Sequence, residues 1–316
     1  MRQVEERYIS LLTDFGFKRI FGTAINKDLL ICFLNSLFDG KQVVKDVSYL
    51  NPEHVGDVYT DRKAIFDVYC EGENGEKFIV EMQNAYQAYF KDRSLFYSTF
   101  PIREQAPKGN DWDFKLNYVY TVALLNFDMN EEAFEKEKIR HSIQLCDTAT
   151  HKVFYDKLEF IYVEIAKFNK SLEKLETLYD KWLYALKNLY KLTQRPKELC
   201  DKVFDRLFEE AEIAKFTPQE MREYETSKMA YRDIKNSVDT AKREGKQEGL
   251  AEGIEIGREK GMKEGMEKGM EKGRAEGKHE ANTETAQRLL AMGLSAEQVS
   301  KATQLPLEII KNLSNT

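Results

Sequence analysis

The chain has 316 residues, of which 42% are hydrophobic and 12% aromatic; this composition excludes a disordered protein and favours a core of roughly 200 residues with an appendage, or two modest domains. Charged residues make up 32% of the chain and nearly cancel, leaving a net charge of -6, which excludes a strongly basic nucleic-acid footprint over the whole chain. The four cysteines lie far apart, without a CxxC motif or a Cys/His cluster, which argues against a zinc site or a disulfide framework.

Two helices are predicted at the start of the chain. In TDFGFKRIFG, residues 13–22, Asp14 and Lys18 are four positions apart and would share one face of a helix. Thr13 or Asp14 could equally cap that helix. The next segment, 26–40, has apolar residues at helical spacing and ends at a glycine, which predicts a second helix.

Three strands are predicted next, over residues 45–53, 62–72 and 76–83. The last two alternate apolar and polar residues with period two, and the loop 73–75 lies between them. A three-residue hairpin loop of this kind requires a residue in the left-handed conformation, which Gly75 adopts without steric cost.

The register of this hairpin places two carboxylates opposite each other. Asp67 faces Glu81, and Gln83 lies on the same side as Glu81, because side chains alternate between the two faces of a strand. The other, core-facing side is formed by Phe66, Val68, Cys70, Phe78, Val80 and Met82. Like charges opposite each other destabilise a sheet unless a cation lies between them, and carboxylate oxygens suit Mg²⁺ or Mn²⁺. The alternative is that Asp67 and Glu81 are ordinary solvent-facing residues.

An Asp on one strand, a short turn and then Glu-x-Gln on the next resembles the PD-(D/E)XK nuclease signature. Three segments, TDFGFKRIFG, DRKAIFDVYCEGENGEKFIVEMQ and DRSLFYSTFPIREQA, together resemble the Rpn family of recombination-promoting nucleases and transposases, over about residues 8–240. The resemblance implies a restriction-endonuclease-like core and Mg²⁺-dependent endonuclease cleavage of DNA in recombination or transposition.

The resemblance also implies roles for individual residues. Asp67 and Glu81 would bind the metal, Gln83 would position the attacking water, and Asp14 and Lys18 would lie near the active cleft. The wider superfamily carries a lysine where this chain has Gln83. A lysine both orients water and stabilises developing negative charge, whereas an amide does only the first. A catalytically inactive DNA-binding or self-associating protein is therefore the second hypothesis.

A further helix is predicted over residues 85–106, where apolar residues recur three and four positions apart. Lys91, Arg93 and Arg103 lie on this helix, which leaves the catalytic strand and is well placed to contact a phosphate backbone. The alternative is an amphipathic helix whose charges are only solvated.

The rest of the first part is predicted to add two strands and two helices. Residues 117–127 are nearly all apolar, which is typical of a strand buried on both faces, and residues 157–168 predict one more strand. Amphipathic helices are expected over 171–192 and 197–216. The sum is an α/β fold, a restriction-endonuclease-like core with a small mixed sheet flanked by helices, followed by a helical C-terminal extension.

Changes in composition divide the chain into four parts. We predict a nuclease-like domain with a helical subdomain over 1–215 and a helical connector over 216–241. A charged, glycine-rich helix or tether follows over 242–280, and a small helical unit over 281–316.

The third part is a ladder of glycines, one at every fourth position from Gly245 to Gly277, among ten basic and ten acidic residues. Nine glycines weaken a lone helix by roughly 0.8 to 1 kcal/mol each relative to alanine, about 8 kcal/mol together. A partner helix that approaches closely over the glycines would offset this loss, which predicts a homodimer through 242–280. A flexible charged tether is the alternative.

Two or three short helices are predicted in the last part. The first ends at Gly293, Ser295 caps the next, and Pro306 opens the last. Because the final helix carries only Lys311 as a basic residue, a packing or protein-interaction unit is favoured over a DNA-reading one.

The expected location is the cytoplasm. The spacing of the cysteines fits a reducing compartment, and no N-terminal targeting pattern is visible. No apolar run approaches the roughly 20 residues that cross a bilayer. We therefore expect no membrane partner, and DNA is the partner that the family resemblance implies.

Overall fold

The computed structural model describes residues 6–54, 64–107 and 112–314. The segment DRKAIFDVYCEGENGEKFIVEMQ begins at residue 61, and its first three residues, 61–63, lie outside the described residues. Residues 1–5 of the predicted first domain and 315–316 of the predicted last one also lie outside them. The chain divides into two compact units, Met1–Asp239 and Thr240–Thr316, and each is described by itself.

The first unit contains both strands and helices. Its strands are β1 (Val47–Tyr49), β2 (Glu53–His54), β3 (Ala64–Ile65), β4 (Val68–Gly72), β5 (Lys77–Gln83), β6 (Val119–Leu125), β7 (Arg140–Cys146) and β8 (Val153–Glu164). Its helices are α1 (Asp14–Phe21), α2 (Lys27–Phe38), α3 (Phe90–Glu104), α4 (Leu178–Asn188), α5 (Lys202–Glu210) and the first part of α6 (Pro218–Ala291).

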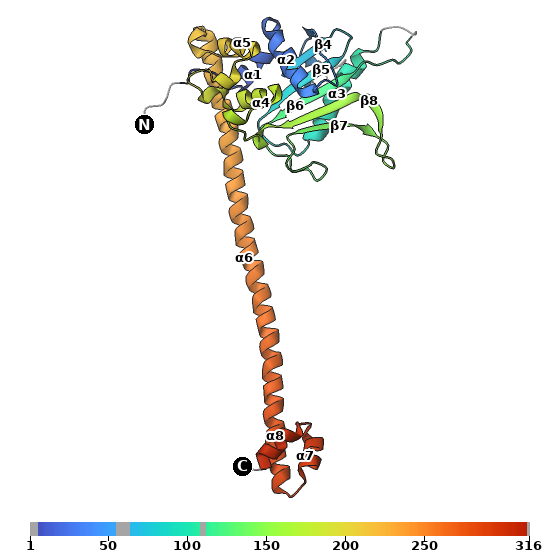
Figure 1. Cartoon of the computed structure of the whole chain (residues 1–316), viewed down its shortest axis with the longest axis vertical. Helices are drawn as coiled ribbons and strands as arrows, with labels where there is room; N and C mark the ends of the chain where they lie inside the picture. The colour runs from blue at the N-terminus through green and yellow to red at the C-terminus, as the bar shows by residue number, and fades with distance from the viewer. Residues whose placement is uncertain (1–5, 55–63, 108–111, 315–316) are drawn as a thin grey trace. The chain divides into compact units, whose positions relative to one another are not determined.

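A six-stranded mixed sheet forms the centre of this unit, in the order β1-β4-β5-β6-β8-β7 (Figure 1). The neighbouring strands β5, β6 and β8 run parallel, and the remaining pairs of this sheet are antiparallel. The predicted α/β class with a small mixed sheet is confirmed.

Helices cover both faces of the sheet. The main core joins one face to α1, α2, α4 and α5, whereas α3 covers the other face over β4, β5 and β6 (Figure 1). All seven residues of β6 are buried as a result. The prediction of a strand buried on both faces is confirmed for this segment.

The β4–β5 hairpin has the predicted register, with Val68 paired to Val80 and Cys70 to Phe78. Gly75 adopts φ +81°, the left-handed conformation that the loop was expected to need. Phe66 is the exception, because it packs with Tyr69 and Ile79 on the face opposite to the predicted one. The chain bends at Asp67, just before β4 begins, so the alternation that holds along the strand does not extend back to Phe66.

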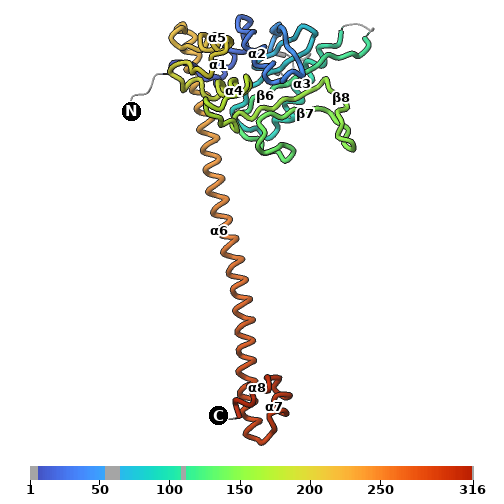
Figure 2. Tube along the Cα trace, in the orientation of Figure 1, coloured from blue at the N-terminus to red at the C-terminus, as the bar shows by residue number. Residues whose placement is uncertain are grey.

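Several predicted bounds are wrong, and one strand was missed. The α-helices predicted over 171–192 and 197–216 cover only Leu178–Asn188 and Lys202–Glu210. The strand predicted over 62–72 is divided into β3 and β4 by the bend. The helix predicted over 85–106 begins only at Phe90. Strand β7 was not predicted, because its residues lie at the edge of the sheet and alternate poorly between buried and exposed positions; Figure 2 shows how its chain runs beside β8.

Helices α1 and α2 supply many of the apolar side chains of the main core. Thr13 caps α1 by accepting a hydrogen bond from the N–H of Gly16 at 3.1 Å, which decides between the two predicted caps. Among the described residues, no single helix is long and apolar enough to span a membrane. The bent pair Asp14–Phe21 and Ala24–Phe38 passes that test by length and composition alone.

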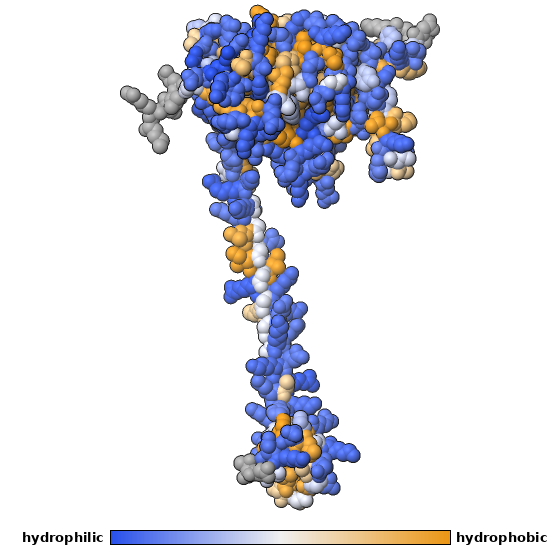
Figure 3. Space-filling view, viewed as in Figure 1, coloured by the Kyte–Doolittle hydropathy of each residue, from blue (hydrophilic) through white to orange (hydrophobic). Residues whose placement is uncertain are grey.

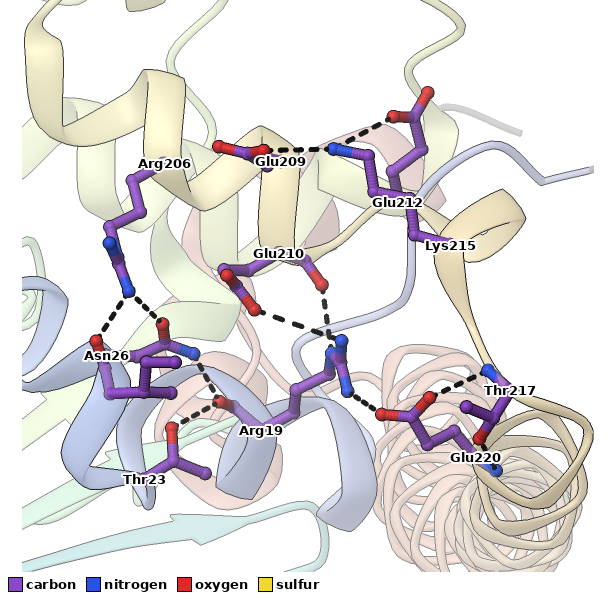
Figure 4. A network of polar contacts seen from close by, with 11 residues as sticks. Arg19, Thr23, Asn26, Arg206, Glu209, Glu210, Glu212, Lys215, Thr217 and Glu220 are labelled. Atoms are coloured by element: carbon purple, nitrogen blue, oxygen red, sulfur yellow. Dashed lines mark hydrogen bonds and ion pairs between the residues drawn. The ribbon is translucent and has the colours of Figure 1, made fainter.

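A polar network ties the beginning of α6 to α1 and α5 (Figure 4). The guanidinium of Arg19 donates to the carbonyl of Glu210 at 3.0 Å and pairs with the carboxylate of Glu220. Glu220 in turn accepts from the N–H of Thr217 at 2.8 Å, and Thr217 accepts from the N–H of Glu220 at 3.2 Å. The helix that carries Lys18 is thereby fixed to the helix that leaves the unit.

The second unit contains the rest of α6, then α7 (Ala296–Thr303) and α8 (Leu307–Ser314). The predicted stop signals are confirmed, since Gly293 adopts φ +88° and Ser295 forms a capping box with Gln298. A small core joins the end of α6 to both short helices, through Ala286, Val299, Leu305 and Ile310.

Candidate active site

Asp67 and Glu81 come together at the edge of the β4–β5 hairpin. Asp67 lies at the bend before β4, and its Oδ2 accepts a hydrogen bond from the N–H of Met82 at 2.9 Å. That bond fixes the Asp67 carboxylate beside the strand that carries Glu81. The side chain of Asp67 is 25% exposed and that of Glu81 only 9%, so neither is an ordinary solvent-facing residue.

Burial beside a second carboxylate disfavours the charged form of both groups. Burial raises the pKa of Glu81 to about 8, and the nearby charge of Asp67 adds to the shift, against the opposing effects of Arg93, Gln83 and Lys18. Burial also raises the pKa of Asp67, opposed by its bond from the Met82 N–H and by Lys18. At neutral pH the pair therefore retains a proton unless a cation replaces it.

Two cationic side chains from separate helices approach this pair. On α1, the Nζ of Lys18 lies 2.7 Å from Oδ1 of Asp14 and 3.9 Å from Oδ1 of Asp67. On α3, a guanidinium nitrogen of Arg93 lies 3.9 Å from Oε2 of Glu81. Although burial opposes it, the hydrogen bond and charge of Asp14, with the charges of Asp67 and Glu81, raise the pKa of Lys18, so its ammonium stays charged.

Gln83 points to the same side of β5 as Glu81. Its Nε2 donates to Oε2 of Glu81 at 3.2 Å. The other carboxylate oxygen, Oε1, is buried and has no hydrogen-bond partner among the described residues. An unsatisfied buried acceptor costs about 1–3 kcal/mol. The cluster formed by Asp14, Lys18, Asp67, Glu81, Gln83 and Arg93 therefore has an oxygen that is suited to a further ligand.

These residues fit a hard divalent cation. Asp67 and Glu81 supply two carboxylates, and the free Oε1 supplies a direct ligand atom. Within the described part of the chain, no group of three or more His, Cys, Asp or Glu side chains is arranged to hold a metal. Two carboxylates match Mg²⁺, which keeps several of its waters and needs only one or two such ligands, better than a closed site of four protein ligands.

Of the three basic residues predicted on α3, only Arg93 lies beside Glu81. Arg93 lies within the cluster, stacked near the rings of Phe90 and Tyr97 at 5.4 and 5.7 Å from their centroids. Lys91 instead binds Glu131, with its Nζ 2.9 Å from a carboxylate oxygen. Arg103 lies ten residues beyond Arg93, about 15 Å farther along the helix.

The contact between Arg93 and Glu81 is one that the sequence did not predict. Arg93, Tyr97 and Phe100 recur at the spacing that places residues on one helix face. This spacing indicates that Arg93 lies on the face of the helix that packs against the sheet. Nothing in the sequence shows which strand residue it meets.

Comparison with known proteins gives one match. A family model described as PD-(D/E)XK nuclease family transposase matches residues 11–241. The matched range includes all six residues of the cluster, namely Asp14, Lys18, Asp67, Glu81, Gln83 and Arg93. No curated protein and no solved structure matches the chain.

Proposed function

We propose that this chain, which belongs to the PD-(D/E)XK nuclease family of transposases, is a metal-dependent DNA endonuclease that acts in recombination or transposition. The observation that carries the proposal is the pair of buried carboxylates, Asp67 and Glu81, with one oxygen left without a partner. The free, widely separated cysteines support a cytoplasmic location.

Asp67 and Glu81 are the proposed ligands of Mg²⁺ or Mn²⁺. Such an ion, when bound, polarises a phosphodiester and lowers the pKa of a water molecule. The protein's part is to hold both carboxylates at one place, through the Met82 N–H bond to Asp67 and the Gln83 amide bond to Glu81. Arg93 partly balances the charge of Glu81 from the other side.

Gln83 and Lys18 share the work that a single lysine does in the wider superfamily. The amide of Gln83 orients a water molecule by hydrogen bonding but adds no charge. Lys18 supplies a fixed positive charge 3.9 Å from Asp67, where it can stabilise negative charge that develops on a phosphate. Asp14 holds the Lys18 ammonium in place at 2.7 Å.

Cleavage of supercoiled plasmid tests the proposal. Wild-type protein with Mg²⁺ or Mn²⁺ should nick or linearise the plasmid, and Asp67→Ala should abolish cutting because it removes half of the carboxylate pair. Glu73→Ala is the matched control, since it removes an exposed carboxylate from the turn of the same hairpin. A plasmid that stays intact with either metal over a range of concentrations would favour an inactive DNA-binding or self-associating protein.

Self-association through residues 242–280 is a separate proposal, supported by the surface of α6. An added Cβ would meet nothing within 4 Å at any of the ladder glycines, from Gly245 to Gly277. Large apolar side chains directly follow several of these glycines and are exposed, namely Leu250, Ile254, Met262, Met266 and Met270. Figure 3 shows hydrophobic groups on this otherwise hydrophilic segment. A second copy that covered them would offset the helix-weakening effect of the glycines.

A further inference from the structure

A pocket with polar and apolar lining lies in the first unit, at the carboxyl ends of the parallel strands β5 and β6. It has a volume of about 270 Å³, and we name it the strand-end pocket. Its lining includes the polar residues Asn84, Asn126, Lys187, Lys191, Tyr231 and Lys235, together with Leu12, Tyr190, Val238 and Asp239. Asn84 directly follows Gln83, so the pocket lies at the end of the strand that carries Glu81 and Gln83.

One wall of the pocket is a chain of fixed polar groups. The amide of Asn84 donates to the carbonyl of Leu12 at 2.8 Å. The amide of Asn126 lies 3.3 Å from both Oδ1 of Asn84 and the hydroxyl of Tyr231, and donates to each. Because the Tyr231 oxygen accepts from Asn126, its own proton is available to donate to a bound ligand.

The lining also carries lysines. Lys187 is half-buried, and its Nζ donates to the carbonyls of Ala166 and Phe168 at 2.9 and 2.5 Å. Burial, and then the charge of Lys191, lower the pKa of the Lys187 ammonium. These two positive charges therefore repel each other across a partly desolvated space.

The charge of the lining is strongly unbalanced. The lining contains three lysines, Lys187, Lys191 and Lys235, and one carboxylate, that of Asp239. Over the described residues, none of these lysines forms an ion pair within 4.0 Å, whereas Lys18 and Lys91 do. Lysine, tyrosine and asparagine side chains are donors that commonly bind phosphate oxygens.

We propose that the strand-end pocket binds a backbone phosphate of the DNA next to the one that is cut. This inference rests on the proposed function, because it assigns the pocket to the same substrate. A phosphate there would accept from Tyr231 and neutralise the excess of positive charge. It would also fix the position of the DNA strand relative to Asp67 and Glu81, because the pocket lies at the end of the strand that carries Glu81.

Binding of a 20-base-pair duplex in EDTA tests the pocket without any cutting. The variant Lys191→Gln/Lys235→Gln replaces two lysines of the pocket lining. Both are exposed, so the fold should be unaffected. We expect about tenfold weaker binding and a slope of log Kd against log salt that is smaller by about 1. Tyr231→Phe, which removes only the hydroxyl, should weaken binding about threefold without changing the slope.

The control variant Lys174→Gln/Lys202→Gln removes two exposed lysines outside the lining. Equal affinity and equal salt slope in the pocket and control variants would overturn the inference, and plasmid cutting by both would leave the proposed function standing. A free phosphate ion is the other source of the same chemistry. If inorganic phosphate stabilises the wild type but not the pocket variant, while DNA binding is unchanged, the assignment to DNA is overturned.

Discussion

Burial of Glu81 beside Asp67 makes the stability of the metal-free protein depend on pH. The folded-state pKa of Glu81 is about 8, above an ordinary value of 4.5, first because of burial and then because of the charge of Asp67. A raised carboxyl pKa favours the folded state while the group is protonated. This contribution to the free energy of unfolding is fully present below pH 4.5 and is lost as pH rises through 8.

We therefore expect the metal-free wild type to lose thermal stability between about pH 5 and pH 8.5. Glu81→Gln removes the ionisation and should show a much flatter dependence over the same range. Added Mg²⁺ should raise the unfolding temperature of the wild type more at pH 8 than at pH 6, because fewer protons compete for the pair. Parallel pH profiles of wild type and variant, measured by calorimetry in EDTA, would argue against the buried pair.

Lys18 and Lys91 offer a matched comparison of two lysines that were both candidates from the sequence. Lys18→Gln should reduce the rate of plasmid cutting by about 10²-fold to 10³-fold, since it removes a positive charge 3.9 Å from Asp67. Lys91→Gln should change the rate by less than about threefold, because Lys91 binds Glu131. Single-turnover rates measure both, and equal losses would show that Lys18 has no special role.

At the scale of secondary structure, features that a few neighbouring residues determine were predicted correctly. Features without such a local signal were not. The β4–β5 register followed from one turn, because a three-residue loop with a left-handed Gly75 fixes which residues face each other. The Ser295 cap of α7 and the helix end at Gly293 were also predicted from single residues, because capping depends on the residue at the helix terminus. Strand β7 was missed, since it is an edge strand whose residues alternate poorly between buried and exposed positions.

The glycine ladder permits a prediction about a single element. Replacing Gly253, Gly257 and Gly261 together by alanine should stabilise the isolated helix, by about 0.8 to 1 kcal/mol at each site, because each site is open. The same change should weaken self-association, since a partner helix could no longer approach as closely. Circular dichroism and sedimentation equilibrium measure the two effects.

Alanine at Lys246, Glu255 and Lys263 is the matched control, because these exposed residues lie in the same segment and leave the glycines in place. An unchanged or tighter dimer in the glycine variant would contradict a contact over the ladder.

At the scale of the whole molecule, cutting and self-association are assigned to different units. Removal of residues 242–316 should abolish self-association and leave metal-dependent plasmid cutting, because the carboxylate cluster lies entirely in the first unit. Removal of 281–316 alone should retain self-association through 242–280. Light scattering after size-exclusion chromatography measures the mass of each form; a monomeric full-length chain would rule out the dimer.

The sequence by itself determined the class of the fold and the candidate carboxylate pair. Alternation along a strand and the geometry of a short turn are local properties, so they predict the β4–β5 register and bring Asp67 close to Glu81. A nearly all-apolar run identified the buried strand β6, and cap and stop residues identified the short helices at the end of the chain. These predictions depend on residues that are close together in sequence.

Only the tertiary structure decided the environment of that pair. The burial of Glu81 comes from α3, the nearby ammonium from Lys18 on α1, and the reversal of Phe66 from a bend at Asp67. The strand-end pocket likewise joins Asn84 and Asn126, at the strand ends, to lysines that follow 61 to 151 residues later in the chain. Periodicity shows which face of an element is apolar, but it does not show which other element covers that face. Desolvation and charge pairing depend on that cover, because both are set by the atoms within a few ångströms, whatever their distance along the chain.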